Sequence, residues 1–157
     1  MIIIVCVDNN NGIAFNGRRQ SQDATVCQDI ARLADGHKLW ATHYGSKLFR
    51  DNETSEIRHL EICVADDPMT MAKDEEFVFL DADMPSEDTI TQYRPEAFII
   101  YHWNTTYPAD RKLNINRLIK SQQERYPSFH SIHTLHGEVH ETITREILFL
   151  TEMGDQI

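Results

Sequence analysis

Cysteine is scarce in this sequence of 157 residues, and its three cysteines, Cys6, Cys27 and Cys63, are too widely spaced to form a CxxC pair or another zinc-binding pattern. The odd number and wide spacing also argue against a disulfide framework. Each cysteine lies in an apolar segment, which indicates buried free thiols in a reducing compartment. We therefore expect a cytoplasmic protein.

Cationic residues are also few, because 15 Lys and Arg stand against 25 Asp and Glu and give a net charge of −10. Such a field repels a phosphate backbone, so broad nucleic-acid binding is disfavoured. No apolar run approaches the roughly 20 residues of a membrane span, and the chain opens on "MIIIVCVD" rather than on a basic leader. We expect a small-molecule ligand or a protein partner, and no membrane. The sequence does not set an oligomeric state.

What the chain does contain is a regular alternation of strand-like and helix-like segments. Ile2–Val7 is continuously apolar and β-branched, which is typical of a central strand buried on both faces. Asp23 is placed to cap a helix that extends to Ala34 before Gly36. Further strands are predicted at 37–42, 58–65, 75–82 and 96–103, helical turns at 44–51 and 86–93, a helix or long connection at 114–126, and a terminal hairpin around His136 and Gly137 with its last strand at 142–151.

These elements predict a single α/β domain over residues 1–157, with a mixed central sheet and flanking helices. In order and spacing they resemble the dihydrofolate reductase family. "IIIVCVDNNNGIAFNG" is similar to the family's opening "AVDxxxGIGxxG", "FVFLDADMPSEDTITQYRPEAFIIYHWNTTYPAD" to a later strand, helix, strand and "FPAD" run, and "HETITREILFLTE" to its last strand. "FNGRRQSQD" also resembles a loop of small bacterial proteins to which no activity is attached.

The resemblance implies an NADPH-dependent reductase of dihydrofolate or a related pterin, with the nicotinamide held between the first and fifth strands. Asp23 would be the catalytic proton donor, although the family's Leu-Pro-Trp before the acid is absent. His43 would replace the arginine that grips the cofactor phosphate, and a neutral imidazole offers no bidentate contact. Asp81 and Ala82 would replace the paired glycines beside the pyrophosphate, adding a charge and a side chain there. These departures make NADP binding and catalytic competence doubtful.

The polar stretch that follows the first strand carries the main binding hypothesis. Two guanidiniums can grip a carboxylate or phosphate, and amides can read the edge of a heterocycle. We predict that this loop binds a small planar or anionic ligand or a protein partner, through Arg18, Arg19, Gln20 and Gln22. The alternative is a solvated loop in which Asp23 only caps the helix.

Three aromatic or imidazole side chains on strands are weaker candidates for ligand contacts. Trp40 could stack on a planar ring, and Tyr101 and His102 lie near the end of the fifth strand, where ligand crevices form. Each could equally be a packing residue.

Histidines concentrate near the C-terminus, at His130, His133, His136 and His140. Side chains alternate along a strand, so His130 and His133 should face opposite ways, and no accompanying ligand spacing indicates zinc. We predict an exposed histidine-rich hairpin without a metal. Three functions stay open: a ligand-binding protein, an NADPH-dependent reductase and a non-enzymatic interaction protein.

Overall fold

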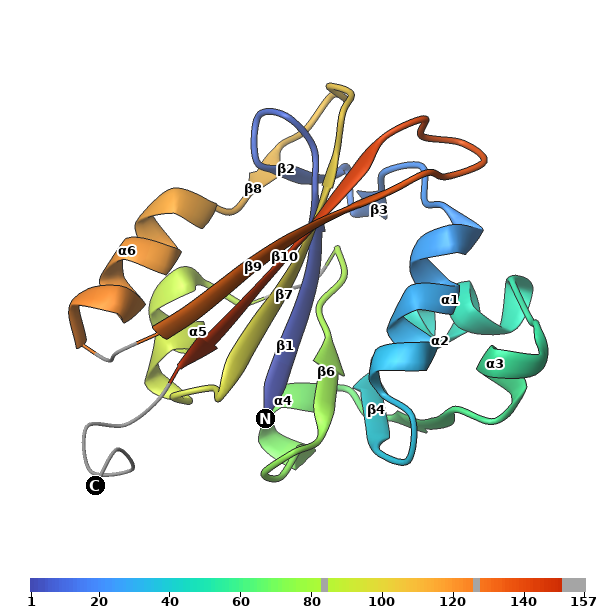
Figure 1. Cartoon of the computed structure of the whole chain (residues 1–157), viewed down its shortest axis with the longest axis horizontal. Helices are drawn as coiled ribbons and strands as arrows, with labels where there is room; N and C mark the ends of the chain where they lie inside the picture. Colours follow the sequence, from blue (N-terminus) through green and yellow to red (C-terminus); the bar gives the residue numbers. More distant parts are fainter. Residues whose placement is uncertain (83–84, 126–127, 151–157) are drawn as a thin grey trace.

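A computed structural model describes residues 1–82, 85–125 and 128–150. A seven-stranded sheet with the order β5-β4-β6-β1-β7-β10-β9 runs through the centre of the molecule (Figure 1). The described strands are parallel except for β10, which pairs antiparallel with both of its neighbours. Their bounds are β1 Ile2–Val7, β4 Lys38–Ala41, β5 Glu61–Val64, β6 Phe77–Phe79, β7 Ala97–Trp103, β9 Ser128–Leu135 and β10 Ile143–Leu150.

Helices cover the two faces of this sheet. The first face packs against α1 (Ala24–Leu33), α2 (His43–Asp51) and α3 (Ser55–Arg58). The second packs against α4 (Pro68–Met71), α5 (Glu87–Gln92) and α6 (Ile115–Arg125). In Figure 1, α5 and α6 lie on the left of the sheet and α1, α2 and α3 on the right. The mixed α/β sheet with flanking helices that the sequence predicts is therefore confirmed.

Strand β1 is the middle of this arrangement because it hydrogen-bonds to β6 on one side and β7 on the other. Ile4 and Cys6 pack into the core of the first face, and Ile3 and Val5 into the core of the second. A strand with helices on both faces can have no polar side, which explains its unbroken apolar sequence.

The segment after β1 differs from its prediction as a loop. β2 (Gly12–Phe15) and β3 (Arg18–Arg19) form a tight hairpin, and β2 also pairs with β8 (Arg111–Lys112) to give a second, three-stranded sheet. The turn consists of Asn16 and Gly17, with φ of 52° and 73°, which is the left-handed backbone of a two-residue hairpin.

The remaining elements follow the sequence with shifted ends. Residues 44–51 form the full helix α2, and the helix-or-connection prediction at 114–126 resolves as α6. α3 and α4 are single turns that the sequence did not predict, and α3 takes the start of the predicted strand at 58–65. The last strand agrees with β10, while Thr151 lies outside the described residues.

One polar cluster is buried between α1 and the sheet. The Tyr101 hydroxyl donates to Asp29 Oδ2 at 2.6 Å, and Arg145 Nη1 lies 2.8 Å from each carboxylate oxygen of Asp29. Burial, together with the neighbouring Asp29 carboxylate, raises the pKa of Tyr101 well above its ordinary value, so the hydroxyl stays a donor. The cluster ties α1 to β7 and β10 at one point.

Replacing Asp29 by Ala should destabilise the fold by about 3 kcal/mol, because it leaves the Arg145 charge and the Tyr101 hydroxyl without their acceptor. Asp51→Ala is the matched control, since Asp51 is exposed and its ion pair with Lys47 is long, at 4.0 Å. This change should lower the free energy of unfolding by less than about 0.5 kcal/mol. Urea unfolding at pH 7 measures both. An Asp29→Ala protein within about 0.5 kcal/mol of the wild type would contradict the assignment.

Candidate ligand site at the carboxyl edge of the sheet

Asp8 follows β1 directly and lies almost fully buried at the carboxyl edge of the sheet. Its carboxylate accepts the backbone N–H of Asn10 and Gly12 at 2.8 Å, that of Tyr107 at 2.9 Å and the Gln20 amide at 3.0 Å. Burial alone would raise the pKa of Asp8, but these donors outweigh it and hold the pKa below the ordinary value. A Cβ on Gly12 would lie 2.8 Å from a carboxylate oxygen, so the close turn requires glycine.

Asp23 is a second buried carboxylate at this edge. It caps α1 by accepting the Thr25 N–H at 3.1 Å, and it accepts the N–H groups of Glu138, Val139 and His140 at 3.1, 2.8 and 2.9 Å. Burial raises its pKa, yet these backbone donors hold the pKa of Asp23 below its ordinary value. The side chain therefore joins the start of α1 to the tip of the β9–β10 hairpin.

This arrangement bears on the proposed acid role of Asp23. A lowered pKa keeps the carboxylate ionised, and its oxygens accept four backbone N–H groups. A Cβ on Gly137 would overlap the carboxylate and would lie 2.7 Å from the His140 carbonyl oxygen, so the hairpin tip is shaped around Asp23. The geometry supports the capping interpretation, and proton donation stays a prediction.

His140 departs from the predicted exposed histidine hairpin because it is buried. Its ring stacks on Trp103 at 4.3 Å between centroids, and Nε2 lies 2.8 Å from the Tyr107 hydroxyl. Burial lowers the pKa of His140, although Asp23 nearby acts in the opposite direction. A packed aromatic neighbour thus makes this histidine part of the core.

The other three histidines of the hairpin, His130, His133 and His136, are exposed. Within residues 1–82, 85–125 and 128–150, no group of three His, Cys, Asp or Glu side chains is arranged to hold a metal ion.

Arg19, in the predicted binding loop, contacts residues that follow β6 and that begin α2. Its Nη2 lies 2.8 Å from Asp81 Oδ2, beyond the end of β6, and its guanidinium stacks 3.7 Å from the centre of the Tyr44 ring. Arg19 also donates to the Tyr44 carbonyl oxygen, in the first turn of α2. The guanidinium is thus held by the protein rather than presented to solvent, whereas Arg18 beside it is exposed.

A crevice of about 270 Å³ opens where β4, β5 and β6 end. Its wall combines apolar residues with carboxylates. Among these, Asp66 and Asp67 are exposed before α4, and Asp81 forms the ion pair with Arg19. The carboxyl ends of parallel strands are the usual place for such a crevice. It is lined by Thr42, Asp66, Asp67, Pro68, Met69, Phe79, Leu80, Asp81 and Pro85.

The other predicted ligand residues are dispersed. The Gln20 amide donates to Asp8, and Gln22, two residues further along the chain, is half-buried. The Tyr101 hydroxyl donates to Asp29 in the core of the first face. None of these three side chains lines the crevice.

Trp40, His43 and His102 lie elsewhere. The Trp40 indole donates to Glu76 at 3.0 Å, His43 is exposed at the start of α2, and His102 Nε2 lies 3.6 Å from a carboxylate oxygen of Glu146. The sequence reasoning missed the roles of Asp8 and Tyr44. The role of Asp8 could have been predicted, because Asp8 and Gly12 match the Asp and Gly of the family's opening motif. The role of Tyr44 could not, because it depends on a contact with Arg19, 25 residues away in the chain.

No protein-family model matches the sequence, and no curated protein matches it. Solved structures do match. A dihydrofolate reductase from Enterococcus faecalis, in a complex with NADP(H) and RAB-propyl, covers 96% of this chain and 96% of its own at a TM-score of 0.57 and 8% identity. The chain has the fold of a dihydrofolate reductase. At 8% identity the likeness concerns the fold alone.

Among the residues that the structure describes, no helix is long and apolar enough to cross a membrane.

Asp23→Ala should lower stability by about 3 kcal/mol, from the lost helix cap and the three hairpin N–H groups left without an acceptor. Asp23→Ser is the matched variant, because its hydroxyl can still cap α1 but cannot reach the hairpin, and about 1 kcal/mol should return. Urea unfolding at pH 7 separates the two contributions. Equal stability of Asp23→Ser and wild type would contradict the hairpin contact.

The same variants give a pH dependence. Since the folded pKa of Asp23 lies below its ordinary value of 3.8, its contribution is complete above about pH 4 and is lost as pH falls through the folded pKa. The stability difference between wild type and Asp23→Ser should therefore shrink on acidification below pH 4.

Proposed function

We propose that this protein binds a small planar ligand in the crevice at the carboxyl ends of β4, β5 and β6, on a dihydrofolate reductase-like scaffold without efficient reductase activity. The observation that carries this proposal is the crevice itself, whose wall combines apolar residues with three carboxylates. Ligand sites combine an apolar body with a few polar groups in this way.

The charges of the crevice favour a neutral, hydroxyl-bearing or cationic ligand over an anionic one. Asp66 and Asp67 are exposed in its wall, and the charge of the buried Asp81 is already balanced by Arg19. Since Arg19 is engaged in this ion pair and in the Tyr44 stack, it gives little support to the anionic ligand that the sequence suggested.

The volume of the crevice supports the same choice. A cavity of about 270 Å³ is near the lower limit of roughly 300–1,000 Å³ for drug-sized ligands, so it accommodates one ring system rather than a dinucleotide.

The three free cysteines, two of them buried, support a reducing, cytoplasmic location for this activity.

Benzamidine, benzamide and benzoate test the proposal, since they share one planar ring and differ in charge. We expect benzamidine to bind at least about fivefold more tightly than benzoate, as a single favourable exposed charge contact of about 1 kcal/mol would give. Two-dimensional NMR titration should place the shifts at Thr42, Met69 and Leu80. Tighter binding of benzoate, or shifts elsewhere, would contradict the assignment.

Matched variants separate the crevice from the loop. The double change Asp66→Asn and Asp67→Asn should abolish the preference for benzamidine, while Asp51→Asn with Asp74→Asn removes the same charge from exposed positions outside the crevice and should preserve it. If Arg18→Ala weakens binding instead, the loop, and not the crevice, holds the ligand.

The reductase alternative has its own test in NADPH binding. β1 and β7 pair continuously from Ile2 and Ala97 to Val7 and His102, so their hydrogen-bonded backbones leave no gap for a nicotinamide. We therefore expect nicotinamide fluorescence to stay unchanged up to millimolar NADPH. Saturable enhancement, accompanied by oxidation of NADPH with dihydrofolate, would establish the reductase and overturn our choice.

A further inference from the structure

Strand β9 lies at one end of the central sheet, and β5 lies at the other (Figure 1). β9 pairs with β10 over its whole length, from Ser128 to Leu135, and with no other strand among those described. Residues 130–134 are all exposed. Since the outer side of an edge strand presents N–H and C=O groups without strand partners, β9 is a template for a further strand.

The sequence of β9 lacks the features that usually protect an edge strand. Such strands are commonly kept from pairing with another molecule by short length, by charged side chains or by proline. β5 has only four residues and begins with the exposed Glu61. β9 has eight residues and contains no Asp, Glu, Lys, Arg or Pro. The two ends of the sheet therefore differ in their capacity to accept another strand.

Ile132, in the middle of β9, adds an apolar contact to this edge. Its exposed fraction of 62% is the largest among the large apolar side chains that the structure describes. Alternate side chains of a strand share a face, so His130 and Thr134 flank Ile132 on the same face of β9. A strand added beside β9 would cover Ile132 and remove its apolar area from water.

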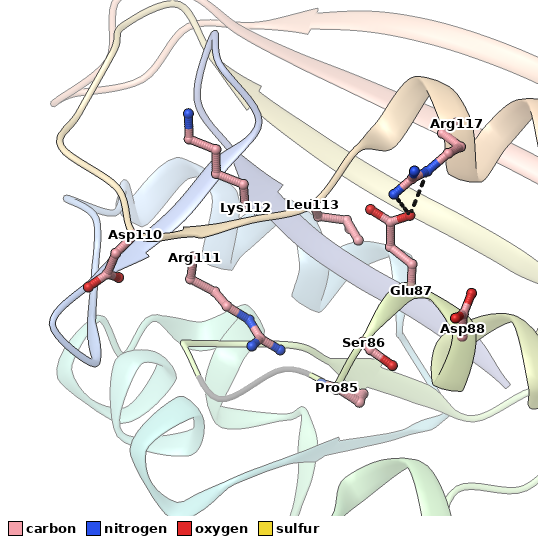
Figure 2. Close-up of a pocket in the computed structure, with 9 residues that line it drawn as sticks. All are labelled: Pro85, Ser86, Glu87, Asp88, Asp110, Arg111, Lys112, Leu113 and Arg117. Atoms are coloured by element: carbon pink, nitrogen blue, oxygen red, sulfur yellow. Dashed lines mark hydrogen bonds and ion pairs between the residues drawn. The ribbon is translucent and has the colours of Figure 1, made fainter.

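The charge of the chain favours a second copy of this chain as the added strand. Each molecule has a net charge of −10, so two copies repel each other through most of their surface. The pocket of about 450 Å³ beside β8 is an example, because most of its wall is charged and Glu87 forms an ion pair with Arg117 there (Figure 2). β9 brings no carboxylate to a contact between copies, and no Lys or Arg that would select an acidic partner.

The charged side chains of β10 that lie beside β9 have partners within the molecule. Arg145, opposite His133 in the sheet, lies 2.8 Å from Asp29. Glu146 lies 3.6 Å from Nε2 of both His102 and His130. These contacts leave the edge itself to backbone groups and uncharged side chains.

We propose that β9 is a dimerisation strand, to which a second copy of this chain adds its own β9 in the antiparallel orientation. A two-fold axis perpendicular to the sheet relates the two strands, so each face of one sheet continues the same face of the other. Opposite residues then share a face, and the register that pairs Ile132 with its counterpart buries both exposed side chains together. The same register places His130 opposite Thr134, and Ser131 opposite His133.

This pairing determines the size and strength of the assembly. Because both molecules use the same edge, the association closes at two copies. One strand from each molecule makes a smaller contact than a standard interface, so we expect a weak dimer with a Kd on the order of 10–100 μM. The dimer is independent of the function proposed for the crevice.

Sedimentation equilibrium of the full chain tests the proposal. The average mass should rise with concentration from 18.3 kDa toward twice that value and no further. Added NaCl should strengthen the dimer, because salt screens the repulsion between two acidic molecules. A chain that stays monomeric up to about 1 mM, or that forms species larger than a dimer, would overturn the proposal.

Ile132→Lys should raise the Kd of the dimer at least tenfold, because it places two like charges opposite each other at the two-fold axis. Val139→Lys is the matched control, since Val139 is 60% exposed but lies on the hairpin tip outside β9. It adds the same charge to the chain and should leave the Kd within about twofold of the wild type. Because Ile132 is exposed, its replacement should not prevent folding. Equal Kd values for the two variants would show that β9 is not the interface.

Cysteine cross-linking tests the register. Ile132→Cys should form a disulfide-linked dimer under mild oxidation, because the two new thiols face each other across the axis. Ser131→Cys is the matched variant and should not link, since its thiol would lie opposite His133 of the other copy. The wild type, with Cys6 and Cys27 buried and Cys63 half-buried, measures the background. Preferential linking of Ser131→Cys, or no linking of Ile132→Cys above that background, would overturn the proposed pairing.

Discussion

The buried carboxylate of Asp8, at the end of the central strand β1, is the constraint on which the carboxyl edge of the sheet depends. An ionised group removed from water must be surrounded by donors, and Asp8 recruits them from the β1–β2 turn, from Gln20 and from the backbone at Tyr107. Three chain segments are therefore fixed relative to β1 by one side chain. The resemblance quoted for the opening of the sequence falls on this Asp8 and on Gly12, which the approach of the carboxylate requires.

Asp23 and Asp81, two further carboxylates at this edge of the sheet, are also buried, but their partners differ. Asp23 is satisfied by backbone N–H groups and organises α1 and the hairpin tip, whereas Asp81 has an arginine as its partner. The first arrangement surrounds the carboxylate that the resemblance implies as a catalytic acid with backbone N–H groups. In the second, Asp81 also lines the crevice at the ends of β4, β5 and β6.

Sequence reasoning succeeded where one local rule decides the structure. The apolar run of β1 and the cap at Asp23 each depend on neighbouring residues, and both agree with the structure. Asn16-Gly17 was also a local signal, since this dipeptide favours a two-residue hairpin, but the polar residues around it suggested a loop. His140 and Arg19 could not be placed from sequence, because their burial depends on Trp103 and Asp81, which lie far away in the chain.

The fold of this scaffold and the charges around its crevice are set by different residues. The sheet is determined by buried apolar strands, which are indifferent to the identity of side chains beyond the strand ends. At those ends, Asp66, Asp67 and Asp81 put negative charge in the wall of the crevice. Because an anion is repelled by a negative potential, these carboxylates favour a neutral or cationic ligand in the crevice over an anionic one.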